Sequence, residues 1–163
     1  MKTHWYIIYS LFFLFVLISC EKDENIDTEK PQILNDFSDA FPTNCDTLYF
    51  GESFDLRLLL TDNMELGSFS IGIHNNFDHH SHSTEVTECS LGPVKEPVNP
   101  LVFIDDYPIP DELKEYETNR MVSIPAENES GLFDEGDYHF FISLTDKEGW
   151  SAQKGLSIKM LYR

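Results

Sequence analysis

The chain has 163 residues, of which 29 are acidic and 11 basic, and its formal net charge is −18 at pH 7. Such a surface repels nucleic acid and anionic lipid headgroups, so the composition argues against binding to either. It attracts cations, including divalent metals, and the length is sufficient for one domain with a substantial core.

The first 19 residues have the pattern of a secretory signal peptide. Lys2 precedes an apolar run, Trp5 to Ile18, which only Ser10 interrupts. This run is shorter than the roughly 20 residues that a membrane-spanning helix needs, and it suits the apolar part of a signal peptide. The alternative is an uncleaved N-terminal anchor.

The segment Leu17-Ile18-Ser19-Cys20 resembles a bacterial lipobox, which implies cleavage before Cys20 and lipidation of its thiol. Residues 20–30 are polar and acidic without apolar spacing, so they predict a flexible tether. The tether begins with Glu21-Lys22-Asp23-Glu24, which resembles the short tag behind the lipidated cysteine of Bacteroidota lipoproteins shown on the cell surface. These resemblances imply a protein anchored by lipid to the bacterial outer membrane and facing the cell surface. The periplasmic face is the alternative.

Three cysteines are present, and lipidation would use one of them. The remaining pair, Cys45 and Cys89, would lie in an oxidising export compartment, where a disulfide is the expected state. Closing a loop of about 45 residues stabilises a folded chain by roughly 4 kcal/mol if chain entropy dominates. The bridge would also tie down the far end of the histidine-rich loop that precedes Cys89. The alternative is that both thiolates are metal ligands.

Residues 31–163 contain short apolar alternations separated by turn residues, which is typical of β-strands. The expected strands are 31–37, 48–50, 54–60, 67–77, an edge strand at 101–104, 121–124, 138–144 and 156–160. Prolines between Gly92 and Pro110 predict a long irregular segment, and residues 110–116 could form one helical turn. About seven to eight strands with almost no helix predict an all-β, antiparallel β-sandwich.

Two features refine this fold prediction. The segment Asp134-Glu135-Gly136-Asp137-Tyr138 has the form of the tyrosine corner of immunoglobulin-like sandwiches, where the hydroxyl bonds to nearby backbone. Tyr138 is therefore predicted to be structural, and the sandwich to be immunoglobulin-like. In addition, residues 54–62 and 138–146 echo each other, because both alternate and both end in Leu-Thr-Asp before a polar turn.

The stretch from His74 to His82 is the clearest sign of a binding site. Between Gly67 and Phe77 one parity is apolar and should face a core, while the other parity is polar and carries His74 outward. Neutral imidazoles together with a carboxylate are ligands that suit zinc, copper or nickel. Because a straight strand would spread these residues too far apart, a single site needs the chain to turn near Asp78.

The candidate metal ligands are His74, Asp78, His79, His80 and His82. His80 and His82 share a face and are the best pair, whereas His79 points the opposite way in an extended chain. His139 has the outward parity of its own strand, and the favoured interpretation is a lone solvent-facing residue, unless that strand neighbours the one with His74. The alternative for the whole stretch is a solvated loop without metal.

Three classes of function remain open. The favoured one is a non-enzymatic binding module that holds a transition metal, with a glycan or another envelope protein as other possible partners. The second is an adhesion or glycan-binding module, in which Trp150 stacks on a sugar and acid-rich turns such as Asp62-Asn63 take calcium, although no turn has a calcium-loop spacing. The third is a metal-dependent hydrolase. No nucleophile elbow, phosphate loop or zincin helix is present, so no catalytic residue is assigned.

Several of these features together resemble one family: the lipobox, the Pro31-Gln-Ile-Leu opening, the segment Ile73 to His82, and the segment Gly136 to Gly149. They are similar to a domain-of-unknown-function family of Bacteroidota lipoproteins with an immunoglobulin-like fold and a His-rich loop. The resemblance covers about residues 30–163. It implies the fold and an envelope location, and it brings no activity or site residues. The expected organisation is a signal peptide at 1–19, a tether at 20–30 and an immunoglobulin-like domain at 31–163.

Overall fold

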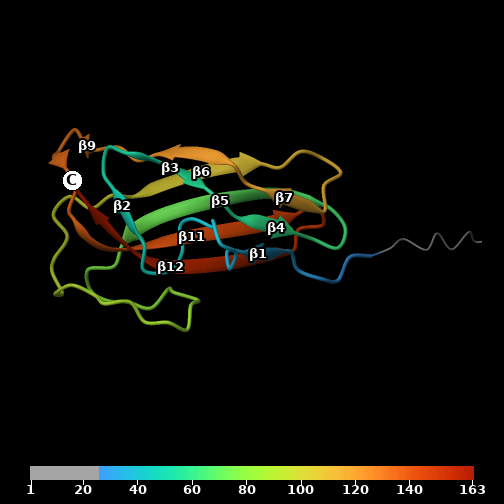
Figure 1. Cartoon of the computed structure of the whole chain (residues 1–163), viewed down its shortest axis with the longest axis horizontal. Coiled ribbons are helices and arrows are strands. Elements are labelled where there is room, and N and C mark those ends of the chain that lie inside the picture. The colour runs from blue at the N-terminus through green and yellow to red at the C-terminus, as the bar shows by residue number, and fades with distance from the viewer. Residues whose placement is uncertain (1–25) are drawn as a thin grey trace, which may run out of the picture.

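The main sheet of the protein has five strands in the order β2-β12-β11-β5-β6 (Figure 1). The structure, a computed structural model, describes residues 26–163, so the predicted signal peptide, Cys20 and the tag at 21–24 lie outside the described residues. The strands are β2 Thr47–Tyr49, β5 Leu66–Asn75, β6 Phe103–Pro108, β11 Gly136–Asp146 and β12 Ser151–Leu161. All neighbours in this sheet are antiparallel except β2, which runs parallel to β12.

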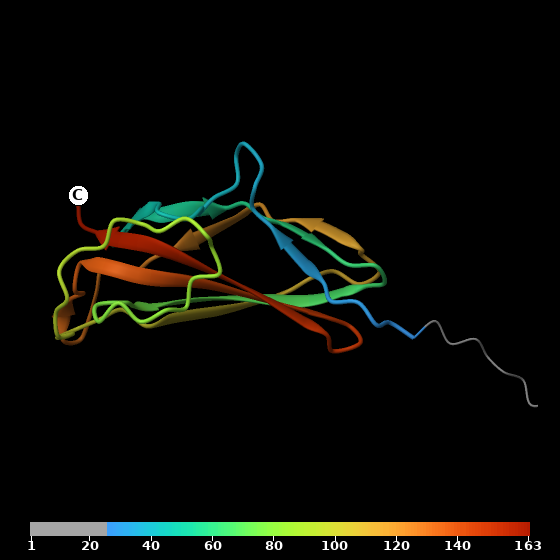
Figure 2. The same cartoon turned by 90° about the horizontal axis from the view of Figure 1, so that it is seen from below.

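Three smaller antiparallel sheets complete the fold, and the larger two lie across one face of the curled main sheet (Figures 1 and 2). One has the order β1-β4-β7, one pairs β3 with β8, and one is the β9–β10 hairpin. Their strands are β1 Gln32–Leu34, β3 Ser53–Leu56, β4 Leu59–Thr61, β7 Glu115–Glu117, β8 Arg120–Ser123, β9 Glu127–Asn128 and β10 Gly131–Leu132. Every regular element in residues 26–163 is a strand, so the all-β prediction is confirmed.

The core forms between these layers from the apolar parities predicted for β5 and β11. Phe69, Ile71 and Ile73 are buried on β5. Tyr138 and Phe140 are completely buried on β11, where Ile142 and Leu144 continue the same face. Because the two strands pair in register, Phe140 lies opposite Ile73 and each apolar row extends the next across the sheet.

Some details of the strand prediction are wrong. The described residues form twelve strands and not seven or eight, because pairs as short as β9 and β10 have no alternation that a sequence can reveal. The predicted strand 54–60 is split into β3 and β4, with Arg57 forming an isolated bridge to Phe41 between them. The expected helical turn at 110–116 is a turn that leads directly into β7.

The predicted tyrosine contact is present. The Tyr138 hydroxyl donates a hydrogen bond to the Asp134 carbonyl at 2.7 Å and accepts one from the Leu101 amide at 3.2 Å. Burial raises the pKa of this hydroxyl to about 12. Tyr138 therefore fastens the long connection before β6 to the start of β11, which is a structural role.

A long loop, residues 76–102, follows β5, and its middle part lies over the face of β11 and β12 opposite the core (yellow-green in Figure 2). The Thr84 amide donates to the Gly155 carbonyl of β12 at 2.9 Å, and the predicted disulfide joins Cys45 to Cys89 further along the loop. This bridge excludes both sulfurs as thiolate ligands. The outer face of the sheet, expected to be in solvent, is therefore partly covered.

Within the described range, no helix has the length and apolar character needed to cross a membrane.

Candidate metal centre

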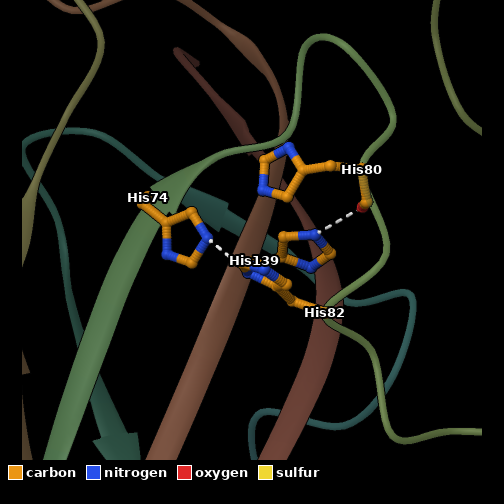
Figure 3. Close-up of side chains that lie close together, drawn as sticks. All are labelled: His74, His80, His82 and His139. Carbon is orange, nitrogen blue, oxygen red and sulfur yellow. Dashed lines mark hydrogen bonds between the residues drawn. The ribbon is translucent and has the colours of Figure 1, made fainter.

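Four histidines from three parts of the fold meet beneath the long loop (Figure 3). His74 comes from β5, His139 from β11, and His80 and His82 from the loop that follows β5. One ring nitrogen of each lies within 4.8 Å of the corresponding nitrogen of every other. The cluster contains three of the five predicted ligands, His74, His80 and His82. Its fourth member, His139, was not among the predicted ligands.

The sheet itself positions two of the four histidines. His74 and His139 are directly opposite each other in the antiparallel pairing of β5 and β11, and their ring centroids lie 5.3 Å apart. Both have the parity that points away from the core, as predicted. The expectation that His139 faces solvent is nevertheless wrong, because the loop covers it and leaves only 1% of the residue exposed. The parity of His139 shows only which face of β11 it lies on. Placing it in the site also requires knowing that β11 pairs with β5.

A tight turn brings the other two histidines back over the sheet, as the prediction of a turn near Asp78 requires. The His79 amide donates to the Asn76 carbonyl at 3.2 Å, and His79 has a φ of 59°, in the left-handed region. The loop then runs against β12 at Gly155, where a Cβ atom would come within 2.1 Å of the His82 carbonyl oxygen. Because Gly155 has no side chain, the loop backbone can lie directly against β12 at this position.

The hydrogen bonds of two histidines leave one nitrogen of each available to a metal. The His80 Nδ1 donates to the Asp78 carboxylate, which leaves Nε2 with its lone pair. The His139 Nε2 donates to the His80 carbonyl at 3.1 Å, and its Nδ1 is buried without a hydrogen-bond partner among the described residues. A carboxylate or carbonyl that holds the second nitrogen of a ligating histidine is the usual arrangement at metal sites.

The distance between the facing nitrogens of His74 and His82 is close to the distance between two ligands of a tetrahedral zinc ion. The His82 Nδ1 and His74 Nε2 lie 3.3 Å apart and share a hydrogen bond in this structure (Figure 3), so one of them would give up its proton to bind a metal. Two ligands on the same zinc ion, with Zn–N bonds of about 2.0–2.1 Å, are separated by about 3.3–3.4 Å in a regular tetrahedron. The other distances between ring nitrogens of the four histidines are within 4.8 Å. Small rotations of the side chains would be needed to bring all four nitrogens to bonding distance from one metal ion.

The surroundings favour the neutral form of two of these histidines, His74 and His139. Burial lowers the pKa of His74, and the neighbouring histidines lower it further. Burial also lowers the pKa of His139, although the hydrogen bond to the His80 carbonyl partly opposes this. Neutral imidazole is the form that donates a lone pair to a metal, so the folded protein favours the binding form.

The remaining predicted ligands lie at the edge of the cluster or outside it. Asp78 is exposed and touches the cluster only through His80. His79 turns away, and its Nε2 lies 3.9 Å from Asp137. His79 and His80 also line a pocket of about 420 Å³ between the loop and the sheet. Trp150, a candidate for stacking on a sugar, donates its indole N–H to the Asp27 carbonyl at 3.1 Å and is not part of this site.

Comparison with known proteins confirms one part of the family prediction, namely a domain of unknown function. No curated protein matches the sequence. A family model described as a domain of unknown function, DUF4625, matches residues 18–161. This match covers most of the chain and includes the four histidines of the cluster and all three cysteines, and the chain therefore belongs to the DUF4625 family.

Proposed function

We propose that this domain is a non-enzymatic module that binds a transition metal, zinc or copper, through His74, His80, His82 and His139. The observation that carries the proposal is the convergence of four ring nitrogens within 4.8 Å. The buried Nδ1 of His139 strengthens it, because an unpaired nitrogen in such a place is costly unless something occupies its lone pair.

The ligand count favours binding over catalysis. A zinc site with four protein ligands is closed, whereas a catalytic site keeps one position open for water or substrate. The four histidines come from two strands and one loop, so a bound metal would fasten the loop to the sheet. The same geometry gives no support to a hydrolase, and no nucleophile is assigned.

The location and the finer fold are part of the proposal. The sequence of the N-terminal region, with its lipobox at Cys20, supports a lipoprotein anchored in the bacterial outer membrane at the cell surface. The tyrosine corner at Tyr138 supports an immunoglobulin-like sandwich. In an envelope location the site would meet metal ions from outside the cytoplasm.

The first test is elemental analysis of the purified, tag-free protein, followed by calorimetric titration with zinc and copper at pH 7.5. The variant His80→Ala/His82→Ala removes two ligands from the exposed loop, and we expect it to lose most of the binding. His139→Gln should weaken binding by roughly tenfold or more, since it removes one ligand of four.

His79→Ala is the matched control, because it removes a histidine from the same loop that does not point into the cluster. We expect this variant to bind as the unchanged protein does. The proposal is wrong if neither metal gives heat at pH 7.5, or if the double variant binds as tightly as the His79→Ala control.

A further inference from the structure

We propose that Asp27, Asp62 and Asp146 form a calcium site, which clamps the N-terminal segment to the domain. One carboxylate oxygen of each lies within 4.8 Å of the others. The three come from distant parts of the chain: the segment before β1, the turn after β4 and the end of β11. This site goes beyond the proposed function and shares no residue with the histidine cluster.

Each carboxylate uses one oxygen to hold a turn and leaves the other without a hydrogen-bond partner in the described part of the chain. The Oδ1 of Asp27 accepts from the Glu29 amide and the Asn63 side chain. The Oδ2 of Asp62 accepts from the amides of residues 64 and 65, and the Oδ1 of Asp146 from those of residues 149 and 150. The unpartnered atoms are Asp27 Oδ2, Asp62 Oδ1 and Asp146 Oδ2.

These unpartnered oxygens are buried, which makes their lack of a partner significant. Asp27 is 5% exposed and Asp146 is 4% exposed. Buried charges are normally paired or bound to a metal, because a buried charge without compensation is costly. No ion pair within residues 26–163 involves any of the three, and the nearby Lys147 is paired with Asp111 and Glu65 instead.

The chemistry of the donors selects the ion. All three candidate ligand atoms are carboxylate oxygens, which are the ligands that calcium prefers, and calcium accepts irregular geometry with backbone carbonyls and waters completing the shell. Magnesium is smaller, demands a regular octahedron and keeps more of its water. A site assembled from three separate segments, with no histidine, therefore suits calcium better than magnesium, zinc or copper.

The proposed site contains the final aspartate of each of the two Leu-Thr-Asp sequences. Asp62 and Asp146 end the two echoing segments, and one carboxylate oxygen of each lies within 4.8 Å of the other. The turn between β11 and β12, which follows Asp146, lies at the end of the molecule where the chain enters the domain (Figures 1 and 2). Asp27 adds the third carboxylate from the entering chain, and the Trp150 indole holds the Asp27 carbonyl. A cation bound by all three carboxylates would thus hold the N-terminal segment against the domain.

The two metal sites lie at opposite ends of β11. His139 and Asp146 are both on this strand, and seven residues of extended chain span about 23 Å. Sites so far apart, with no ligand in common, can be removed separately. The failure of one proposal is therefore distinguishable from the failure of the other.

The test is thermal unfolding of the full chain in EGTA and in rising calcium. At ten times the dissociation constant, calcium should raise the unfolding temperature by about 5 °C. The variant Asp62→Asn/Asp146→Asn keeps an amide oxygen for each turn and loses two anionic ligands. We expect it to be at least as stable as the unchanged protein in EGTA, because it relieves charge repulsion, and to show no calcium response.

Asp106→Asn is the matched control, because Asp106 is an exposed acid on β6 outside the cluster. This variant, and His80→Ala/His82→Ala, should respond to calcium as the unchanged protein does. The exposed Glu29 is a site for a glutamate-specific protease, and we expect cleavage there to require release of the N-terminal segment from the calcium site. Calcium at ten times its dissociation constant should therefore slow this cleavage roughly tenfold.

Three results would overturn the proposal. They are an unfolding temperature that 10 mM calcium leaves unchanged, an equal calcium response from the double aspartate variant, and a stronger response to magnesium than to calcium. The concentration of about 10 mM exceeds the dissociation constants of about 0.1–1 mM that are usual for extracellular calcium modules.

Discussion

At the scale of single residues, the candidate site depends on which nitrogen of each histidine is free. His80 Nδ1 is held by Asp78, and His139 Nε2 is held by the carbonyl of His80, so the other nitrogen of each ring is not used by these bonds. Burial lowers the pKa of both His74 and His139. The protein thus positions neutral imidazoles before any metal arrives, which reduces the cost of forming the site.

This protonation predicts how the protein responds to acid. A lowered folded-state pKa means that the unfolded chain binds protons more readily, so stability is full above the unfolded histidine pKa of about 6.5 and falls as the pH drops below it. Metal binding should weaken over the same range, because protons compete for the lone pairs. Calorimetry at pH 7.5 and 5.5 measures the second effect, and denaturant unfolding of the metal-free protein measures the first. Binding that is equally tight at both pH values would contradict the histidine assignment.

At the scale of elements, the site depends on how the loop lies on the sheet. β5 and β11 place His74 opposite His139, but the loop must approach β12 closely to add the other two histidines. That approach occurs at Gly155, whose missing side chain leaves room for the backbone of His82. The disulfide between Cys45 and Cys89 holds the loop further along.

We therefore predict that Gly155→Ala weakens metal binding without unfolding the domain. The added Cβ would come within 2.1 Å of the His82 carbonyl, so the loop backbone must move away and carry its histidines with it. Affinity for zinc should fall by roughly tenfold or more, since the ligand positions tolerate little displacement. Gly72→Ala on β5 is the control, because its Cβ would meet its nearest neighbour at an ordinary 3.9 Å. Equal affinity of Gly155→Ala and Gly72→Ala, measured by competition with a chelator, would show that the loop does not depend on this contact.

At the scale of the whole molecule, the strongly acidic chain holds two clusters of potential ligands at opposite ends of its main sheet. One cluster is made of nitrogen donors and the other of carboxylates, so they suit different metals. The acidic surface should concentrate cations near both without selecting between them. Selectivity therefore rests on the ligand atoms.

The proposed anchoring of the molecule is testable independently of the metals. We expect Cys20→Ala to abolish acyl labelling and to release the protein from membranes or leave it unprocessed, because stable anchoring requires the acyl chains. Fractionation of cells that express each form, together with labelling by a fatty-acid analogue, measures both effects. The lipobox interpretation is wrong if membrane association and labelling persist in the variant.

Several features were predictable from the sequence because they depend on local pattern. Alternation at Phe69 to Ile73 and at Tyr138 to Leu144 predicted the core faces of β5 and β11, since successive side chains on a strand point to opposite sides. The expectation of an export signal, together with the even pair of cysteines, predicted the disulfide that the structure contains. Three of the five predicted metal ligands were also found together, because they lie within one short stretch that needed only a turn.

By itself, the sequence determined the all-β class, the apolar faces of the central strands, the disulfide pair and the histidine-rich loop. Only the tertiary structure decided that His139 faces His74, that Gly155 admits the loop, and that Asp27 meets Asp62 and Asp146. The physical reason is that periodicity reveals the direction of a side chain on its own strand, whereas neighbours are chosen by strand pairing. Pairing depends on the packing of the whole core, so residues far apart in the chain form a site that no local pattern contains.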